Sequence, residues 1–474
     1  MFSVTSKIPK YVQVSILMSL GGVVFGLDTG TIGPLTTMPQ FSETFGELSS
    51  TLHGLVVSTI LVAAATSSFF AGHLANSMGR VKSVAIGATL FGIGAAIEAG
   101  SVKLGMLFAG RAIKGLGEGL FMSTSVVYIT EISPPHYRGT LGSIPQFLTT
   151  FALCAGYFIC YGSVNINSSF SWRLPFAVQA VISFIFASTT ILLLPESPRW
   201  LSSRGMKPEA LAAWEKLEIG TADRGKHDEK EMDEIPQAVK IRDILDTFHR
   251  DVWKQTSLGV FLNAMQQLSG IDGVLYYAPL LFAAAGLNSN TASFLASGIS
   301  ALLIFLVTIP AFLLADKWGR KSSTTVGGII QLTCMFVIGS LYAGGAVHKG
   351  HGAARWVVII LIYIFAMTYA ATWAVAFRVY SSEIQPPKTR AGASSLALSA
   401  NLITNWIVAF TTPIFLAKSD FGVYFLFGGA ALVTVVVCAI WMPETKGKSL
   451  EEIQGAFESK SKRVTIEISD LKGA

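Results

Sequence analysis

Twelve apolar runs, each about 20 residues long, constrain the fold of this chain more than any other feature of its sequence. A helix rises 1.5 Å per residue, so a run of that length just crosses the hydrocarbon core of a bilayer. Backbone polar groups find no water there, and a helix satisfies them within its own segment. The sequence therefore predicts an all-α membrane protein with twelve transmembrane helices. We place these near 12–33, 53–75, 83–101, 105–129, 142–162, 174–194, 257–285, 291–315, 324–345, 356–380, 392–416 and 421–442.

The composition excludes a water-soluble fold. Hydrophobic residues make up 51% of the 474, and charged residues only 14%, whereas soluble domains have roughly 25% charged residues. Too few polar residues would remain to cover a soluble core. The net charge of +6 suits loops that face anionic lipid, so the expected partner is the lipid bilayer and not nucleic acid. The sequence indicates no obligate protein partner.

Three short motifs occur twice, at nearly one spacing. They are Gly79-Arg80 with Gly319-Arg320, Glu131 to Arg138 with Glu383 to Arg390, and Pro195-Glu196-Ser197 with Pro443-Glu444-Thr445. The offsets of 240, 252 and 248 residues indicate two parallel repeats, with a solute site between them near the bilayer midplane. We predict an N-terminal six-helix half (1–195), a cytoplasmic linker with short helices (196–256), a C-terminal six-helix half (257–442) and a cytoplasmic tail (443–474).

The distribution of Lys and Arg predicts the side of the membrane on which the termini lie. With both termini cytoplasmic, the short cytoplasmic loops contain eight of these residues and the opposite loops five. Asn167-Ser168-Ser169 is a glycosylation sequon in a predicted outside loop, which agrees with that orientation. We therefore expect a multi-pass protein of the plasma membrane with both termini in the cytoplasm.

Several segments, spread from the first span to the last, together form a specific pattern. They are Gly21-Gly22-Val-Val-Phe25-Gly26-Leu-Asp28-Thr29-Gly30, Gly110-Arg111, Pro195-Glu-Ser-Pro-Arg199, Gln266-Gln267-Leu-Ser-Gly270-Ile-Asp272 with Tyr276-Tyr277, Asp316-Lys-Trp-Gly-Arg-Lys321 and Pro443-Glu-Thr-Lys-Gly447. This pattern resembles the sugar porter branch of the major facilitator superfamily, and most closely its fungal, proton-coupled monosaccharide transporters. The resemblance implies the major facilitator fold, alternating access by rocking of the two halves, and a sugar as the solute.

Two charges within the apolar spans, Asp28 and Arg111, suggest a functional role because unpaired charges are costly there. In the proton-coupled porters that the chain resembles, the matching acid and Arg form a proton switch. An adjacent Arg favours the ionised carboxylate and burial favours the protonated one, so movement of the Arg would load or release a proton. The proton is then the coupling ion, and no cofactor is expected. The alternative is a static ion pair that braces the first and fourth spans.

Lys114 and Glu118 lie one helical turn apart on one face of the fourth span. Typical relatives have small or apolar residues there. Either the two side chains neutralise each other or they form a second proton-linked site, and the sequence leaves both possibilities open.

Polar groups on facing helices can exchange hydrogen bonds with the hydroxyls of a sugar. The resemblance assigns that role to Gln146, Gln266, Gln267 and Asn401, with aromatic surface from Phe25 and Tyr277. The alternative role of the glutamines is hydrogen bonding between membrane helices.

The chain departs from the resembled pattern at this predicted solute site. Asp272 replaces an Asn and Arg378 a Trp, while Leu402 and Ile304 replace a Trp and an Asn. Asp272 and Arg378 either pair across helices, or Arg378 binds an anionic solute, since its guanidinium fork suits carboxylates. A neutral monosaccharide is the first expectation, and a sugar acid of the uronate, aldonate or quinate type is the alternative.

Charged residues recur at the predicted cytoplasmic ends of the helices in both halves. They are Arg80, Glu131, Arg138 and Glu196 in the first half, and Arg320, Glu383, Arg390 and Glu444 in the second. The resemblance implies inter-helix salt bridges that close the cytoplasmic side in the outward-facing state. Exposed ion pairs contribute only about 0–1 kcal/mol each, but a network can bias two states that differ by a few kcal/mol. Membrane orientation alone would also place Arg in such loops.

Other functional classes have less support. The sequence contains no P-loop, HExxH, nucleophile-elbow or metal-ligand pattern, so we expect neither an enzyme nor a metal site. A facilitative uniporter would commonly lack the acid at Asp28. A transporter-like nutrient sensor usually has a longer C-terminal extension than the roughly 30 residues that follow Pro443 here.

Overall fold

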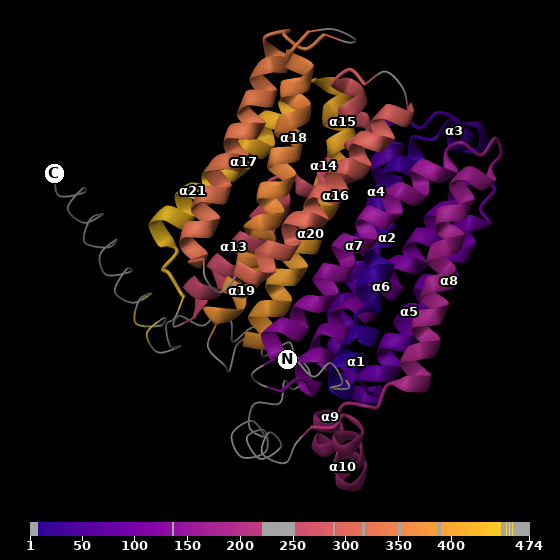
Figure 1. Ribbon diagram of the computed structural model, residues 1–474, viewed down its shortest axis with the longest axis vertical. Helices are drawn as coiled ribbons and strands as arrows, with labels where there is room; N and C mark the ends of the chain where they lie inside the picture. Colours follow the sequence, from indigo (N-terminus) through magenta and orange to yellow (C-terminus); the bar gives the residue numbers. More distant parts are fainter. Residues whose placement is uncertain are drawn as a thin grey trace, which may run out of the picture.

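A computed structural model describes residues 8–134, 137–219, 252–287, 290–314, 318–348, 352–385 and 390–446, with 452, 455 and 457. These residues form a bundle of long helices (Figure 1). The first helices are α1 (Lys10–Met18), α2 (Leu20–Thr36), α3 (Pro39–Phe45), α4 (Ser50–Met78), α5 (Arg80–Ala99), α6 (Leu104–Ile132), α7 (Arg138–Ser163) and α8 (Phe170–Leu193), followed by the short α9 (Pro198–Ser203) and α10 (Lys207–Lys216). The others are α13 (Trp253–Leu268), α14 (Ile271–Tyr276), α15 (Ala278–Ala284), α16 (Asn290–Leu314), α17 (Arg320–Ala343), α18 (Ala354–Ala371), α19 (Trp373–Glu383), α20 (Arg390–Lys418) and α21 (Gly422–Trp441).

The described residues contain the twelve predicted crossings. Ten helical stretches are long and apolar enough to cross a membrane. An eleventh, α6, has 29 residues, which is ample length, but it carries Arg111, Lys114 and Glu118 within its first half. The twelfth consists of α13, α14 and α15, which together occupy the seventh predicted run. The chain is therefore an all-α membrane protein, as the sequence predicts.

The seventh span is interrupted twice, so the prediction of one continuous helix over 257–285 is wrong. Gly270 separates α13 from α14 with a φ of 90°, a left-handed conformation that favours glycine. A Cβ at this position would also collide with the ring of Phe427. The second break is at Tyr277, where Pro279 follows within the first turn of α15 and supplies no amide hydrogen.

The packing of the helices repeats between the two halves. In the first half α2 packs against α7, and α5 packs against α6 and α8; in the second, α13 packs against α20, and α17 against α18 and α21. The halves stand side by side (Figure 1) and meet along two helix pairs, α4 with α20 and α7 with α16, which correspond to each other under the repeat. The boundaries of the four predicted regions stay predictions, and 220–251 of the linker and most of the tail lie outside the described residues.

The short helices distinguish the two ends of the bundle. α9 and α10 lie where α1 begins, below the first half in Figure 1, and we call this the α9 end. α3 and α15 lie at the opposite end, which we call the α3 end. Large apolar side chains remain exposed on the outer faces, as Leu192 of α8 does with 77% exposure. Such a surface is suited to lipid and not to water.

Candidate functional site

Five charged side chains are buried together inside the first half. Asp28 in α2, Glu98 in α5, and Arg111, Lys114 and Glu118 in α6 are each at most 4% exposed. The three on α6 are spaced i, i+3 and i+7, so they share one face of that helix. We call these five residues the charge cluster. Buried charges are costly unless they are paired, so the contacts within the cluster decide what it can do.

Lys114 is the centre of the charge cluster. Its Nζ lies 2.6 Å from a carboxylate oxygen of Asp28 and 2.5 Å from one of Glu98. The same atom donates to Oε1 of Gln179 in α8 at 2.8 Å. The contacts with Glu98 and Gln179 are hydrogen bonds, and the contact with Asp28 is an ion pair. Lys114 therefore joins α2, α5 and α8 to α6.

Arg111 contacts the same two carboxylates at longer range. Its Nη1 lies 3.7 Å from Asp28 and 3.6 Å from Glu98, while Nη2 donates to the carbonyl oxygen of Val57 at 2.8 Å. The predicted Asp28–Arg111 pair is present, but it is the looser of the two contacts that Asp28 makes with a cation.

Sequence reasoning missed two features of the charge cluster. The suggestion that Lys114 and Glu118 neutralise each other is wrong, because the ammonium group pairs with Asp28 and Glu98 instead. Glu98 itself was absent from the prediction. The signal that could have found it is the acidic residue itself, which lies inside an apolar span where charges are rare and functional.

A second polar cluster lies in the other half, where α13 faces α20. Gln267 Nε2 donates to Asn401 Oδ1 at 3.2 Å, and Asn401 Nδ2 donates to Gln266 Oε1 at 3.1 Å. Asn401 also donates to the carbonyl oxygen of Asn263 at 2.9 Å, and Gln266 to that of Trp373 at 3.2 Å. The structure thus brings three predicted solute residues, Gln266, Gln267 and Asn401, into one amide cluster.

Asp272 in α14 accepts a hydrogen bond of 2.6 Å from Nδ2 of Asn405 in α20. Sequence reasoning missed Asn405, although it follows Asn401 by one helical turn and so shares its face. The side chain of Arg378 lies outside the described residues, and its pairing with Asp272 stays a prediction. Two buried oxygens, Gln267 Oε1 and Asn405 Oδ1, have no hydrogen-bond partner in the described structure. They are free to accept hydroxyl groups of a solute.

The other predicted solute residues are placed differently. Gln146 in α7 and Phe25 in α2 are partly buried. Tyr277 is 1% exposed, donates to the carbonyl oxygen of Ala409 at 2.6 Å, and packs edge-on against His53 with 5.3 Å between ring centroids. In this conformation Tyr277 belongs to the contact between the halves and presents no open aromatic surface.

The two halves approach each other very closely near the α3 end. A Cβ on Gly33 of α2 would collide with the carbonyl oxygen of Tyr276 in α14. A Cβ on Gly54 of α4 would collide with the carbonyl oxygen of Phe410 in α20. Only glycine allows backbones to come this close. Near the α3 end the two halves therefore touch at two places that leave no room for a side chain.

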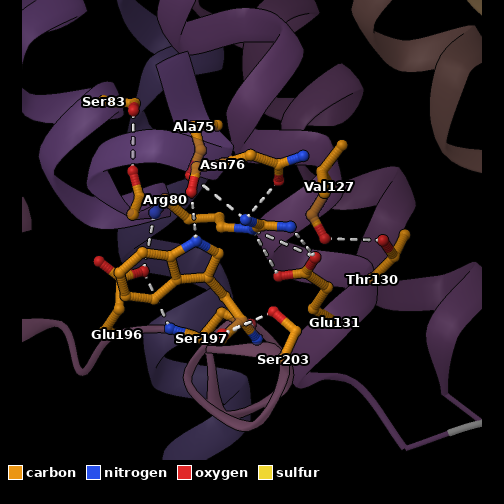
Figure 2. Close-up of polar contacts among 12 residues, drawn as sticks. Ala75, Asn76, Arg80, Ser83, Val127, Thr130, Glu131, Glu196, Ser197 and Ser203 are labelled. Atoms are coloured by element: carbon orange, nitrogen blue, oxygen red, sulfur yellow. Dashed lines mark hydrogen bonds and ion pairs between the residues drawn. The ribbon is translucent and has the colours of Figure 1, made fainter. Parts of the chain in front are cut away.

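Figure 2 shows the charged network of the first half at the α9 end. The Arg80 guanidinium donates to both oxygens of Glu131 at 2.8–3.2 Å and to Oδ1 of Asn76 at 2.8 Å. The Glu196 carboxylate accepts from the backbone N–H groups of Arg80 at 2.8 Å and of Val81 at 3.2 Å. It thereby caps the first turn of α5, where anions are favoured. Burial raises the pKa of Glu196, although these backbone hydrogen bonds oppose the shift.

The second half repeats this network. Arg320 Nη2 donates to Glu383 at 3.0 Å, and the Glu444 carboxylate accepts from the backbone N–H groups of Arg320 at 2.7 Å and of Lys321 at 3.1 Å. A glycine precedes each Arg, and a Cβ on either glycine would collide with the capping carboxylate. The duplicated Gly-Arg and Pro-Glu motifs are thus one structural unit, present once in each half.

Within the part of the chain that the structure describes, the ion pairs of these charged networks join helices of one half. Arg80 links α5 to α6, and Arg320 links α17 to α19. The side chains of Arg138 and Arg390, which also belong to the predicted gating set, lie outside the described residues. The gating role of all these residues stays a prediction.

A bundle of two repeated membrane-spanning halves, with buried charges in one and buried amides in the other, defines a membrane transport protein. The family model for the sugar (and other) transporter family matches residues 14–457, and the chain belongs to that family. The predicted membership of the sugar porters is confirmed. Because the family consists of transporters, the chain is not an enzyme.

Curated relatives and solved structures match nearly the whole chain. The glucose transporter GlcP of Staphylococcus epidermidis is 33% identical over 452 residues, which cover 94% of this chain and 97% of the relative. The galactose-proton symporter of Escherichia coli K12 is 29% identical over 445 residues, 93% of each protein. The inward-open structure of the xylose transporter XylE from E. coli superposes with a TM-score of 0.76 at 26% identity, covering 94% of this chain and 99% of that one.

Proposed function

We propose that this chain carries a monosaccharide across the plasma membrane by proton-coupled symport, with both termini in the cytoplasm. The observation that carries the proposal is Asp28, a carboxylate buried within 2.6 Å of Lys114 and 3.7 Å of Arg111. Burying such groups in a membrane span costs several kcal/mol, so ionisable residues there usually have a function. Coupling of transport to a proton is a function that an acid beside two cations can perform. Relatives named as a galactose-proton symporter and as glucose transporters support the same function.

The amide cluster favours a neutral sugar over a sugar acid. Gln267 Oε1 and Asn405 Oδ1 are buried acceptors without a partner, and the hydroxyl groups of a sugar are donors that would fill them. XylE, a structural relative, has been solved with a bound 6-bromo-6-deoxy-D-glucose, which is a neutral sugar analogue.

Alternating access follows from the contacts between the halves. With the termini in the cytoplasm, the α3 end is extracellular, and the close contacts at Gly33 and Gly54 hold the two halves together at that end. When the halves rock and the α3 end opens, Asp28 can take up a proton from outside. A protonated Asp28 no longer attracts Lys114 and Arg111, and return to the present conformation restores both contacts and removes the proton from Asp28. The proton is the only coupling ion that this scheme requires.

Uptake by purified protein in proteoliposomes, loaded with a pH-sensitive dye, tests the proposal. With a proton gradient directed inward, we expect uphill uptake of glucose, galactose or xylose, a matching influx of protons, and loss of both with a protonophore. Asp28→Asn should abolish uphill uptake but preserve sugar counterflow, because counterflow moves no net proton.

Three outcomes would contradict the proposal. Uptake that is insensitive to the protonophore would indicate a uniporter. Uphill uptake that survives in Asp28→Asn would remove Asp28 from the coupling. Uptake of galacturonate or gluconate without uptake of any neutral sugar would exclude a neutral substrate and favour the sugar-acid alternative.

A further inference from the structure

The charge cluster contains one carboxyl group more than it has cations. Lys114 and Arg111 balance Asp28 and Glu98, which they contact at 2.5–3.7 Å. Glu118 is 3% exposed, and its Oε2 is buried without a hydrogen-bond partner in the described structure. A dry site that holds two cations and three carboxyl groups is neutral only when it carries one proton. The proton must therefore lie on one of the three acids.

Among the charges of α6, Glu118 lies nearest to the α9 end. α6 ends beside α9, so residues later in α6 lie nearer the α9 end. Glu118 is one turn beyond Lys114, about 6 Å farther along the helix axis toward that end. Glu118 therefore lies on the cytoplasmic side of the other two α6 charges in the orientation proposed above.

We propose that Glu118 is a proton relay, which accepts the coupling proton from Asp28 and passes it toward the α9 end. This inference rests on the proposed proton symport. In the transfer the O–H bond at Asp28 breaks and an O–H bond forms at Glu118, so the cluster keeps the same total charge and nothing is oxidised or reduced. Asp28, once ionised, regains the contacts with Lys114 and Arg111 that the structure shows. The present conformation is then the state in which the proton has reached Glu118.

The other titratable groups that face the relay do not compete for this role. Glu98 is held by both Lys114 and Arg111, so it is the fixed counter-charge of the two cations. Tyr276 of α14, in the second half, lies within electrostatic range of Asp28 and Glu118, but its phenol holds its proton too firmly to exchange it with a carboxylate. Glu118 is the one carboxyl group of the cluster without a paired cation.

Substitution of Glu118 in the same proteoliposomes tests the relay. Glu118→Gln keeps the size of the protonated acid but cannot release a proton. We expect its sugar counterflow to match the wild type, while net uptake driven by the pH gradient falls at least about 100-fold, the lower end of what a positioned acid or base contributes. Glu118→Asp retains a carboxyl group and should recover part of the net uptake.

The readouts separate the relay from simpler explanations. Net uptake by Glu118→Gln equal to the wild type would overturn the relay. Parallel loss of counterflow and net uptake in both variants would show that Glu118 is structural, which would overturn it too. Absence of sugar-dependent proton influx in the wild type would instead refute the proton symport itself, and the relay with it. Size-exclusion chromatography of each variant confirms that the protein compared is folded.

Discussion

The ammonium group of Lys114 lies 2.6 Å from a carboxylate oxygen of Asp28, nearer than the guanidinium of Arg111 at 3.7 Å. Lys114 is held in turn by Glu98 at 2.5 Å, on a different helix. Asp28 is therefore part of a chain of charges across three helices and not of a simple pair. Removal of one member leaves an uncompensated charge on the others, because none of them reaches water.

Lys114→Met should destabilise the protein by about 3–5 kcal/mol, because it leaves two buried carboxylates with one distant cation. The double variant Lys114→Met/Glu98→Gln restores the charge balance and should recover a large part of that loss. Thermal unfolding of purified protein in detergent, followed by tryptophan fluorescence, measures both. A single variant as stable as the wild type would contradict the pairing. A double variant no better than the single would assign the loss to packing.

Gly33→Ala should prevent closure of the α3 end, since its Cβ would collide with the backbone of Tyr276 and backbone cannot give way. We expect sugar uptake to fall at least about tenfold, because a collision of a few kcal/mol suffices to depopulate the closed state. Gly162→Ala is the matched control, since a Cβ there meets nothing within 4 Å. The measurement compares the initial uptake rates of the two variants and the wild type at equal amounts of protein. Equal losses in both variants would make the effect one of helix propensity.

Asp272→Ala should weaken sugar binding without uncoupling it from the proton. The substitution removes the acceptor of Asn405 and leaves that amide misplaced for the solute. A hydrogen bond to a charged group contributes about 1.5–3 kcal/mol, so the KM for sugar should rise roughly 10- to 100-fold. The ratio of protons to sugar should not change. Asp272→Asn retains an acceptor and should have a much smaller effect; equal KM values in both variants would count against a role of this oxygen.

Glu196→Gln and Glu444→Gln should each destabilise their own half by about 1 kcal/mol, the usual contribution of a helix cap. Each carboxylate accepts two backbone N–H groups at the start of a helix, α5 or α17. Thermal unfolding in detergent measures the loss. Glu47→Gln, at an exposed acid, is the control. A pair of cap variants no less stable than this control would show that the caps are dispensable.

The raised pKa of Glu196 predicts a pH dependence of stability. Because burial raises the pKa above the ordinary value of 4.5, the folded protein binds more protons than the unfolded chain between 4.5 and the raised pKa. The contribution of Glu196 to stability is then full below pH 4.5 and is lost as the pH rises through the raised pKa. Melting temperatures measured from pH 4.5 to neutrality should fall less in Glu196→Gln than in the wild type. Identical slopes would refute the shift.

Much of the fold could be predicted because its causes are local. The length of an apolar run sets a membrane crossing wherever it occurs, and the duplicated motifs identify two halves without any knowledge of their packing. The break at Gly270 could not be predicted in the same way. The residue that excludes a side chain there is Phe427, on a helix far away in the sequence, and no local pattern records that contact.

The candidate site shows the same contrast between local patterns, which the sequence reveals, and contacts between distant helices, which it does not. Spacing within one helix makes Glu118 the obvious partner of Lys114, since the two are neighbours at i and i+4. The true partners, Asp28 and Glu98, come from two other helices, and their contact depends on how those helices pack. Resemblance to a family supplied Arg111 and the amides because they belong to the resembled pattern. It could not supply Lys114 or Glu98, for which the resembled pattern assigns no role.

Each half closes on itself through a contact between residues that are more than half of its length apart in the sequence. Glu196 lies 116 residues beyond Arg80, whose amide it caps, and Glu444 lies 124 residues beyond Arg320. During synthesis α5 and α17 therefore enter the membrane long before the carboxylates that complete their first turns exist. We expect the first turn of each helix to stay uncapped until the ribosome has synthesised the Pro-Glu motif at the end of that half. A nascent chain interrupted before Glu196 would be left with an open first half, exposed to degradation, so the unit of maturation is the half and not the single helix.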